Sequence, residues 1–241
     1  MLKRFLAALG LGFVAPGSAQ PALSSQPDRP VSFGFKTAWL ALQTEETRAV
    51  ASFLGLRNAV PANWSSSIQA VYRADRQTDG GATFIAPPVD GWTLVVTTLD
   101  MAADQQGSIQ KLTELLETLS RAFGDAQYFG SYRVVDYVAW FRAENGQLVR
   151  GFSWVGSEGE VLANTGPVTK AERDLGYGVV DELAPEQVTD LIFAEEGDTL
   201  RFPGEEDPSL IAAGWSIDPQ TLEGRDDVAP ATGLFGIRPA F

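Results

Sequence analysis

Residues 132–155 read YRVVDYVAWFRAENGQLVRGFSWV, and this stretch decides the fold class. Asn145-Gly146 divides it into two runs rich in valine and aromatic residues. Asn-Gly is the preferred pair for a two-residue hairpin turn, because both positions of that turn need positive φ. The stretch therefore predicts antiparallel strands over 132–142 and 147–155. A third strand is expected over 160–164, after the turn residues Ser157-Glu158-Gly159, and it extends the hairpin to a meander.

The turn also predicts a register for the hairpin. If Asn145 and Gly146 form the turn, Glu144 pairs with Gln147, and regular pairing continues outward from there. The predicted pairs are Phe141–Arg150, Ala139–Phe152, Tyr137–Trp154 and Arg133–Glu158. Because side chains alternate between the two faces of a strand, all of these lie on one face. That face is an aromatic strip with an ion pair at its far end, and the other face, with Trp140, is nearly as apolar.

Two interpretations of the aromatic strip remain open. We expect Tyr137, Phe152 and Trp154 to be core residues beneath helices, because large aromatic side chains are usually buried. The alternative is an aromatic platform that binds a sugar, a peptide or a loop of a partner. Arg150 is unusual in such a strip, and it is either a rim residue with its charge in solvent or an anion-binding group.

The rest of the chain places helices and further strands around this meander. The predicted strands are 33–42, 82–86 and 92–97, and the predicted helices are 45–54, 64–72, 109–123, 185–194 and 208–215. Asn63 is expected to cap the second helix. There is no βαβ rhythm and no glycine-rich phosphate loop. We therefore predict an α+β fold, in which an antiparallel sheet containing the meander carries helices on at least one face.

The N-terminus has the pattern of a cleavable signal peptide. Lys3 and Arg4 precede an apolar run over 5–15, and Gly17-Ser18-Ala19 supplies small residues before Gln20. The run is too short to span a bilayer as a helix. We therefore expect a signal peptide over 1–19 and a periplasmic or secreted protein with no stable membrane insertion after cleavage. The alternative is a cytoplasmic structural domain whose N-terminal helix is buried.

Composition divides the remaining chain into three parts. Residues 20–30 are rich in Pro, Ser, Ala and Gln and predict a flexible leader. Residues 31–218 carry the periodic patterns and predict a single α+β domain. Residues 219–241 are dominated by Gly, Pro and Asp, so a loosely ordered tail is expected there.

Charge and residue types exclude several functions. The chain has 18 Lys and Arg against 31 Asp and Glu, a net charge of -13, which opposes binding to nucleic acid or to an anionic membrane. It has no Cys and no His. Thiolate nucleophiles, serine–histidine triads and zinc or iron sites of the usual type are therefore excluded, and no cofactor is expected. A basic protein, a polysaccharide or Ca²⁺ remains compatible with this composition.

Few residues stand out as functional candidates. They are Tyr137, Arg150, Phe152, Trp154, Arg133, Glu158 and Glu160. Glu158 and Glu160 flank a turn near the end of the aromatic strip, and two carboxylates across a groove are what glycoside hydrolysis requires. Arg133 and Glu158 are expected at the rim of the strip. Acidic clusters at 195–198 and 205–207 do not have the spacing of a calcium loop and are expected to be solvated charge.

Several motifs carry a resemblance to other proteins. The stretch FGFKTAWLA at 33–41, with Trp64, PPVDGW at 87–92 and Tyr132-Arg133, resembles a group of bacterial proteins with no assigned activity, some of which also look exported. The likeness covers roughly residues 31–218. Its motifs consist of Trp, Pro and Gly, which are residue types that shape a fold. The resemblance therefore implies a shared fold and carries over no functional residue.

Two functions are consistent with these observations. The first is an exported, non-catalytic binding or accessory protein, such as an inhibitor, an immunity-type protein or an envelope factor, whose acidic surface suits a basic partner. The second is a carboxylate-based hydrolase that acts on envelope polysaccharide. An open cleft with converging carboxylates favours the hydrolase, whereas a closed core with a flat apolar surface favours the binding protein.

Overall fold

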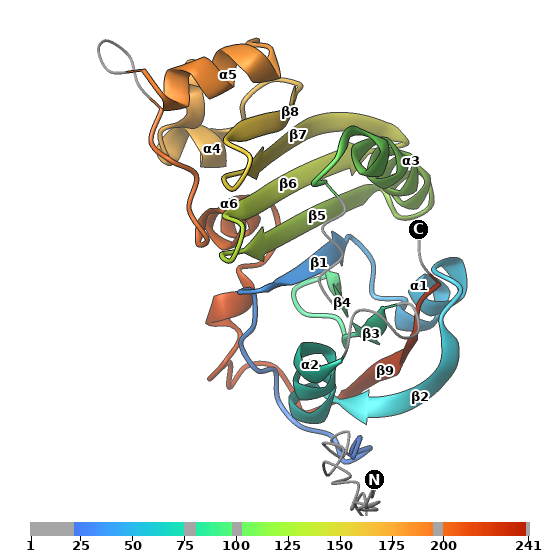
Figure 1. The fold of residues 1–241 in the computed structure, drawn as a ribbon. Helices are drawn as coiled ribbons and strands as arrows, with labels where there is room; N and C mark the ends of the chain where they lie inside the picture. The colour runs from blue at the N-terminus through green and yellow to red at the C-terminus, as the bar shows by residue number, and fades with distance from the viewer. Residues whose placement is uncertain (1–21, 75–80, 98–102, 195–199, 240–241) are drawn as a thin grey trace, which may run out of the picture.

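A computed structural model describes residues 22–74, 81–97, 103–194 and 200–239 of the chain. Within these residues nine strands form one sheet in the order β2-β9-β3-β4-β1-β5-β6-β7-β8 (Figure 1), and all neighbours are antiparallel. The strands are β1 (Thr37–Leu42), β2 (Arg57–Asn63), β3 (Ala82–Ile85), β4 (Thr93–Thr97), β5 (Asp125–Tyr132), β6 (Tyr137–Glu144), β7 (Gln147–Val155), β8 (Glu160–Thr165) and β9 (Thr232–Ile237). The predicted α+β class and the meander, β6 to β8, are confirmed.

Helices cover both faces of the sheet. They are α1 (Thr47–Phe53), α2 (Trp64–Arg73), α3 (Gln106–Phe123), α4 (Lys170–Asp174), α5 (Pro185–Ile192) and α6 (Asp207–Trp215), with short 3₁₀ turns η1 (Tyr177–Val180) and η2 (Pro219–Thr221). Side chains of α2, α5 and α6 join one hydrophobic core, whereas those of α1 and α3 join the other. Cover on both sides explains why both faces of the hairpin are apolar.

β1 lies in the middle of the sheet because its sequence, TAWLAL, is apolar on both faces. All six residues are buried. Trp39 and Ala41 enter the core formed with α2 and α6, and Leu40 and Leu42 enter the core formed with α1 and α3. Since β4 and β5 pair with its two edges, β1 joins the N-terminal strands to the meander.

The sequence patterns do not predict three of the strands, namely β2, β5 and β9. β9 lies inside the sheet between β2 and β3, so the expectation of a loosely ordered tail is wrong for residues 232–237. Its glycines allow this close fit. A Cβ atom on Gly233 would lie 2.2 Å from the carbonyl oxygen of Ile85, and one on Gly236 would lie 2.6 Å from that of Arg57. The glycines that resemble a tail in the sequence are what the strand needs to approach its neighbours.

The segment expected to be a flexible leader packs against the domain from residue 22 onward. The Asp28 carboxylate accepts hydrogen bonds from the backbone N–H groups of Trp64 and Ser65, at 2.7 and 3.0 Å, at the start of α2. Asp28 also pairs with Ala231 in an isolated β-bridge. Asn63 caps α2 as predicted. Asp28 thus contacts both the start of α2 and the residue that precedes β9. Residues 22–30 therefore belong to the fold, and the expectation of a flexible leader is wrong for them.

The hairpin turn forms as predicted, but the register beyond it differs. Asn145 and Gly146 have φ values of 50° and 88°. Two residues into β7 the register shifts, and Val149 has no partner, so that Arg142 pairs with Arg150. Such a bulge places one extra residue in one strand, and a slip of one residue moves every later side chain to the opposite face.

The aromatic strip is therefore divided between the two faces of the sheet. Trp140 and Phe152 are paired across the strands and stacked, with 4.4 Å between ring centroids, and they enter the core of α2, α5 and α6 together with Trp154. Tyr137 enters the other core. The prediction that Tyr137 pairs with Trp154 is wrong, because the bulge at Val149 shifts the pairing so that Tyr137 pairs with Val155. No local sequence signal marks this bulge.

The sequence predicts no stable membrane insertion of the mature protein and a cleavable signal peptide at the N-terminus. Among the described residues, no helix is both long enough and apolar enough to cross a bilayer. The signal peptide expected over 1–19 and its cleavage site lie outside the described residues.

Candidate functional site

Three of the residues singled out in the sequence are core residues. Tyr137, Phe152 and Trp154 are 0%, 0% and 2% exposed. The Phe152 ring lies 5.4 Å from that of Tyr177, and the Trp154 ring lies 6.2 Å from that of Phe202. The core interpretation of these three residues is confirmed, so they do not form an exposed platform.

Arg150 is buried rather than placed at a rim. Its Nε and Nη2 each lie 2.7 Å from Oε1 of Glu172, and the two side chains are 1% and 0% exposed. Nη1 donates to the Asn164 side chain and to the Thr165 carbonyl. Oε1 of Glu172 also accepts a hydrogen bond from Nε1 of Trp140. Arg150 therefore joins α4 to the sheet and is not accessible to an anion from solvent.

The remaining candidates, Arg133, Glu158 and Glu160, are exposed residues at two turns of the meander. Arg133 lies in the turn between β5 and β6, and Glu158 and Glu160 lie at the turn between β7 and β8. The predicted ion pair between Arg133 and Glu158 is not formed, since within the described chain neither side chain makes an ion pair. Glu158 and Glu160 line neither of the two pockets described below. The two carboxylates therefore lie outside both of these pockets.

The acidic cluster at 205–207 is partly structural. Asp207 is 2% exposed, accepts a 2.6 Å hydrogen bond from the hydroxyl of Tyr177 and forms an ion pair with Arg201. The cluster at 195–198 lies outside the described residues. In the parts of the chain that the structure describes, no group of three or more Asp or Glu side chains is placed to hold a metal ion.

A polar cleft of about 330 Å³ opens at one end of the sheet. Its lining residues are Gln43, Trp92, Gly124, Asp125, Arg142, Glu144, Asn145 and Trp215. The strand register explains how they meet. Leu42, the last residue of β1, pairs with the first residue of β4 and with Ala126 of β5, and Asp125 pairs with Glu144 of β6. Segments far apart in the sequence therefore end side by side, and α6 adds Trp215.

Arg142 is the central charged group of the cleft. Its Nε and Nη2 donate to Oδ2 of Asp125 at 3.0 and 2.7 Å, and Nη2 lies 2.9 Å from Oε1 of Glu144. The two carboxylates thus hold the guanidinium from neighbouring positions on β5 and β6. Nη1 makes no hydrogen bond with the described residues, and the side chain is 26% exposed, so this nitrogen can donate to a ligand.

Asp125 is the buried member of this group. Burial raises the pKa of Asp125 above its usual range, and the hydrogen bonds and charge of Arg142 oppose that effect. Its second oxygen, Oδ1, accepts a 3.2 Å hydrogen bond from the side-chain amide of Gln127, which in turn accepts a 2.7 Å hydrogen bond from Ser216. Since both carboxylate oxygens have partners inside the protein, Asp125 orients Arg142 rather than facing a ligand.

Two tryptophans border the cleft. Trp215 lies beside the guanidinium of Arg142, with 5.8 Å between Cζ and the ring centroid, and this cation–π contact restrains the arginine. Trp92 is only partly buried, and it follows a tight turn in which Asp90 and Gly91 have φ values of 49° and 81°. Trp92 is therefore the indole that has free surface for a ligand.

The open groups of the cleft can both donate and accept hydrogen bonds. The exposed Gln43 and Asn145 each have an amide with two donor hydrogens and one acceptor oxygen. Glu144, whose side chain is 41% exposed, accepts, and Nη1 of Arg142 donates. An indole face beside such groups suits a ligand that has both an apolar face and hydroxyl groups.

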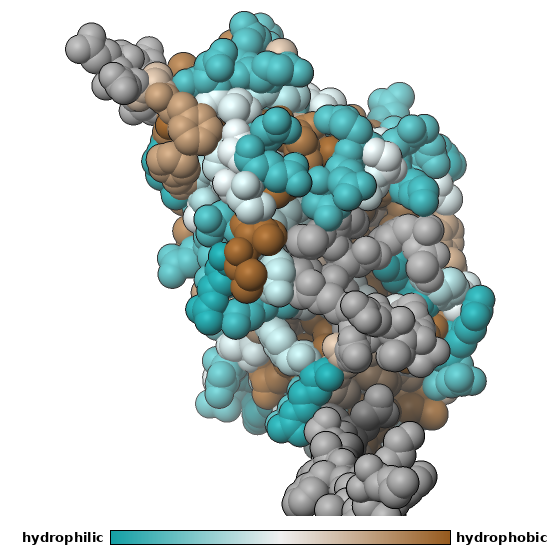
Figure 2. Space-filling view, viewed as in Figure 1, coloured by the Kyte–Doolittle hydropathy of each residue, from teal (hydrophilic) through white to brown (hydrophobic). Residues whose placement is uncertain are grey.

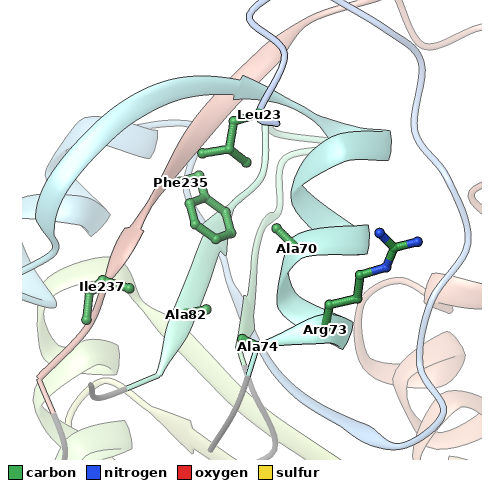
Figure 3. A pocket seen from close by; sticks show the side chains of 7 residues that line it. All are labelled: Leu23, Ala70, Arg73, Ala74, Ala82, Phe235 and Ile237. Atoms are coloured by element: carbon green, nitrogen blue, oxygen red, sulfur yellow. The ribbon is translucent and has the colours of Figure 1, made fainter. Parts of the chain in front are cut away.

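A second pocket is smaller and apolar. It measures about 110 Å³ and lies between α2, β3 and β9 (Figure 3). Its lining residues are Leu23, Ala70, Arg73, Ala74, Ala82, Phe235 and Ile237. Figure 3 shows the guanidinium of Arg73 on the outer side of α2, directed away from Leu23 and Phe235. No other lining residue has a polar side chain that could orient a ligand, so the polar cleft is the stronger candidate.

None of the cleft residues is among the functional candidates predicted from the sequence. The turns PPVDGW at 87–92 and Asn145-Gly146 are the only local signals, because they deliver Trp92 and Asn145 to the same end of the sheet. The contact between Arg142 and Trp215 joins residues that are far apart in the chain, and no local pattern indicates it.

Comparison with known proteins identifies no relative: no protein family, no curated protein and no solved structure matches this chain. The functional argument therefore rests on the geometry of the cleft and on the sequence.

Proposed function

We propose that the protein is an exported binding protein that holds a saccharide, such as a segment of envelope polysaccharide, in the polar cleft without transforming it. The observation that supports this proposal most is the lining of the cleft. A partly exposed indole, Trp92, lies with the restrained guanidinium of Arg142 and with the exposed polar groups of Gln43, Glu144 and Asn145. An aromatic face suits the C–H face of a sugar ring, and planar polar groups suit its hydroxyls.

The hydrogen bonds of Asp125 favour binding over hydrolysis. Glycoside hydrolysis needs one carboxyl group that gives a proton to the leaving oxygen and a second that acts as base or nucleophile. Asp125, with its raised pKa, would have to be the acid, but its oxygens accept hydrogen bonds from Arg142 and Gln127 and its side chain is 8% exposed. Glu144 then has no catalytic counterpart, and the cleft supports recognition rather than proton transfer.

The N-terminal sequence supports a location where envelope saccharides occur. Lys3 and Arg4, the apolar run over 5–15 and Gly17-Ser18-Ala19 have the order of a signal peptide. We therefore place the mature protein in the periplasm or outside the cell.

The proposal is tested by titrating the purified protein with oligosaccharides. Chitin, β-glucan and peptidoglycan glycan fragments are added while heat is measured by calorimetry. We expect saturable binding of at least one of them. Gln43→Ala and Glu144→Gln should each weaken it about fivefold or more. The first variant removes an amide that hydrogen bonds to the ligand, and the second replaces a charged acceptor by a weaker neutral one. Gln147→Ala is the matched control, since Gln147 is an exposed residue of the same hairpin that does not line the cleft.

Two outcomes would contradict the proposal. One is that none of the oligosaccharides binds, or that binding is the same in the cleft variants and in Gln147→Ala. The other is that the protein releases reducing ends from an oligosaccharide and loses this activity in Glu144→Gln, which would establish hydrolysis instead.

A further inference from the structure

An exposed pair of phenylalanines lies at the opposite end of the hairpin from the cleft. Phe193 and Phe202 are 54% and 59% exposed, and their rings are 5.7 Å apart in an edge-to-face arrangement. Both rings lie against Trp154, at 6.2 Å each, so a fully buried indole supports them from below. We call this pair the aromatic surface. Figure 2 shows apolar atoms gathered at the upper left, where the chain leaves α5.

The aromatic surface is bordered by carboxylates that make no ion pair with any residue in the described ranges. Gly159 is next to the Phe193 ring, and Val161 N–H donates to Thr189 of α5, so the turn after β7 is held against this helix. The exposed carboxylates of this region are Asp136, Glu158, Glu160 and Asp190, and two exposed arginines, Arg133 and Arg173, make no ion pair with the described residues. The charge of Arg201 is offset by Asp207. Negative charge therefore predominates around two exposed aromatic rings.

We propose that the aromatic surface docks a basic segment of a partner protein, in which apolar side chains contact Phe193 and Phe202 and adjacent Lys or Arg side chains face Glu158, Glu160 and Asp190. Charge complementarity selects this occupant. A second copy of this chain would bring like charges together, because each copy has a net charge of -13. Aromatic anchors inside a charged rim are the usual anatomy of a protein-binding surface.

This docking surface is independent of the saccharide cleft. The aromatic surface adjoins the end of β7 at Val155, whereas the cleft adjoins the start of β7 at Gln147. Both ligands can therefore be bound at once. Loss of one site by mutation should leave the other unchanged, which separates a failure of this inference from a failure of the proposed function.

The test uses labelled peptides and fluorescence anisotropy. The probe is a peptide in which lysines flank two leucines, and the comparison peptides replace leucine by serine or lysine by glutamate. We expect Phe193→Ser/Phe202→Ser to weaken binding of the first peptide about tenfold or more. Glu158→Gln/Glu160→Gln, which changes only exposed side chains, should weaken binding about threefold or more and reduce its dependence on salt.

Matched controls come from the opposite side of the molecule. Phe53→Ser removes a phenylalanine that is 40% exposed on α1, and Glu45→Gln/Glu46→Gln removes two exposed carboxylates. Neither control should alter binding. Equal binding of the leucine and serine peptides, or equal loss in the controls, would reduce the effect to general charge attraction and overturn the inference. A dimer in sedimentation that disappears in Phe193→Ser/Phe202→Ser would overturn it in favour of self-association.

Discussion

The buried ion pair between Arg150 and Glu172 gives a sharp prediction about stability. Glu172→Gln keeps the size of the side chain and its hydrogen-bond acceptor for Trp140, but it leaves the Arg150 guanidinium without a countercharge. Since the two side chains are 1% and 0% exposed, water cannot replace the lost partner. Breaking one partner of such a pair costs about 3–5 kcal/mol of unfolding free energy. Arg150→Met should cost a similar amount, because it leaves the carboxylate uncompensated.

The double variant is the decisive measurement. Arg150→Met/Glu172→Gln removes both charges, so its loss of stability should be smaller than the sum of the single losses by about 2 kcal/mol or more. Urea unfolding followed by tryptophan fluorescence gives all four free energies, and the single variants should also melt about 10 °C lower.

An exposed ion pair on the same helix is the control. Lys170 and Asp174 of α4 have side chains that are 83% and 60% exposed, so Lys170→Gln should cost about 0.5 kcal/mol or less. If the single variants of the buried pair cost no more than Lys170→Gln, or if their losses are additive, the argument that burial makes this pair essential is refuted.

Three further predictions concern the core, the tyrosines and the N-terminus. Trp154→Ala removes an indole that is 2% exposed and should lower the unfolding free energy by about 3–5 kcal/mol in urea melts, and an unchanged midpoint would contradict the core assignment. Burial raises the pKa of Tyr137 and Tyr177 well above the usual range, so the stability tied to their neutral form is complete below about pH 10 and is lost as pH rises through the raised values. A pH titration of phenolate absorbance should therefore show fewer than five tyrosines ionising before the fold is lost, and ionisation of all five in the folded protein would show the burial argument to be wrong. N-terminal sequencing of protein expressed in a Gram-negative host should begin at Gln20, and a soluble cytoplasmic product that retains Met1 would exclude the signal peptide.

The sequence by itself determined the local structure of this protein. Asn145-Gly146 forms the predicted turn, Asn63 caps α2, and TAWLAL forms a strand buried on both faces. These features depend on neighbouring residues only, because turn φ values, capping hydrogen bonds and apolar runs are local properties. The α+β class followed from them, since alternating strands and amphipathic helices without a βαβ rhythm leave few other arrangements.

Tertiary structure decided which face each side chain of the hairpin occupies. One unpaired residue, Val149, divides the aromatic strip between two cores. The carbonyl of Val149 approaches Gly166 so closely that a Cβ atom there would lie 2.0 Å from it, so a contact with the chain beyond β8 accompanies the bulge. A pattern read along one strand contains no information about such a contact.

Tertiary structure also decided where a ligand can bind. The cleft exists because the ends of β1, β4, β5 and β6 meet and because α6 brings Trp215 to Arg142. In the sequence of β6 alone, Arg142 is a polar residue near a turn, and nothing there indicates a binding site. For Arg150 the sequence predicts a rim position or an anion-binding site, whereas the structure places it in the core. The buried Glu172 of α4, which forms an ion pair with it, explains this position. Charges are placed by partners distant in the chain, because a buried charge is stable only where a countercharge and hydrogen bonds replace water.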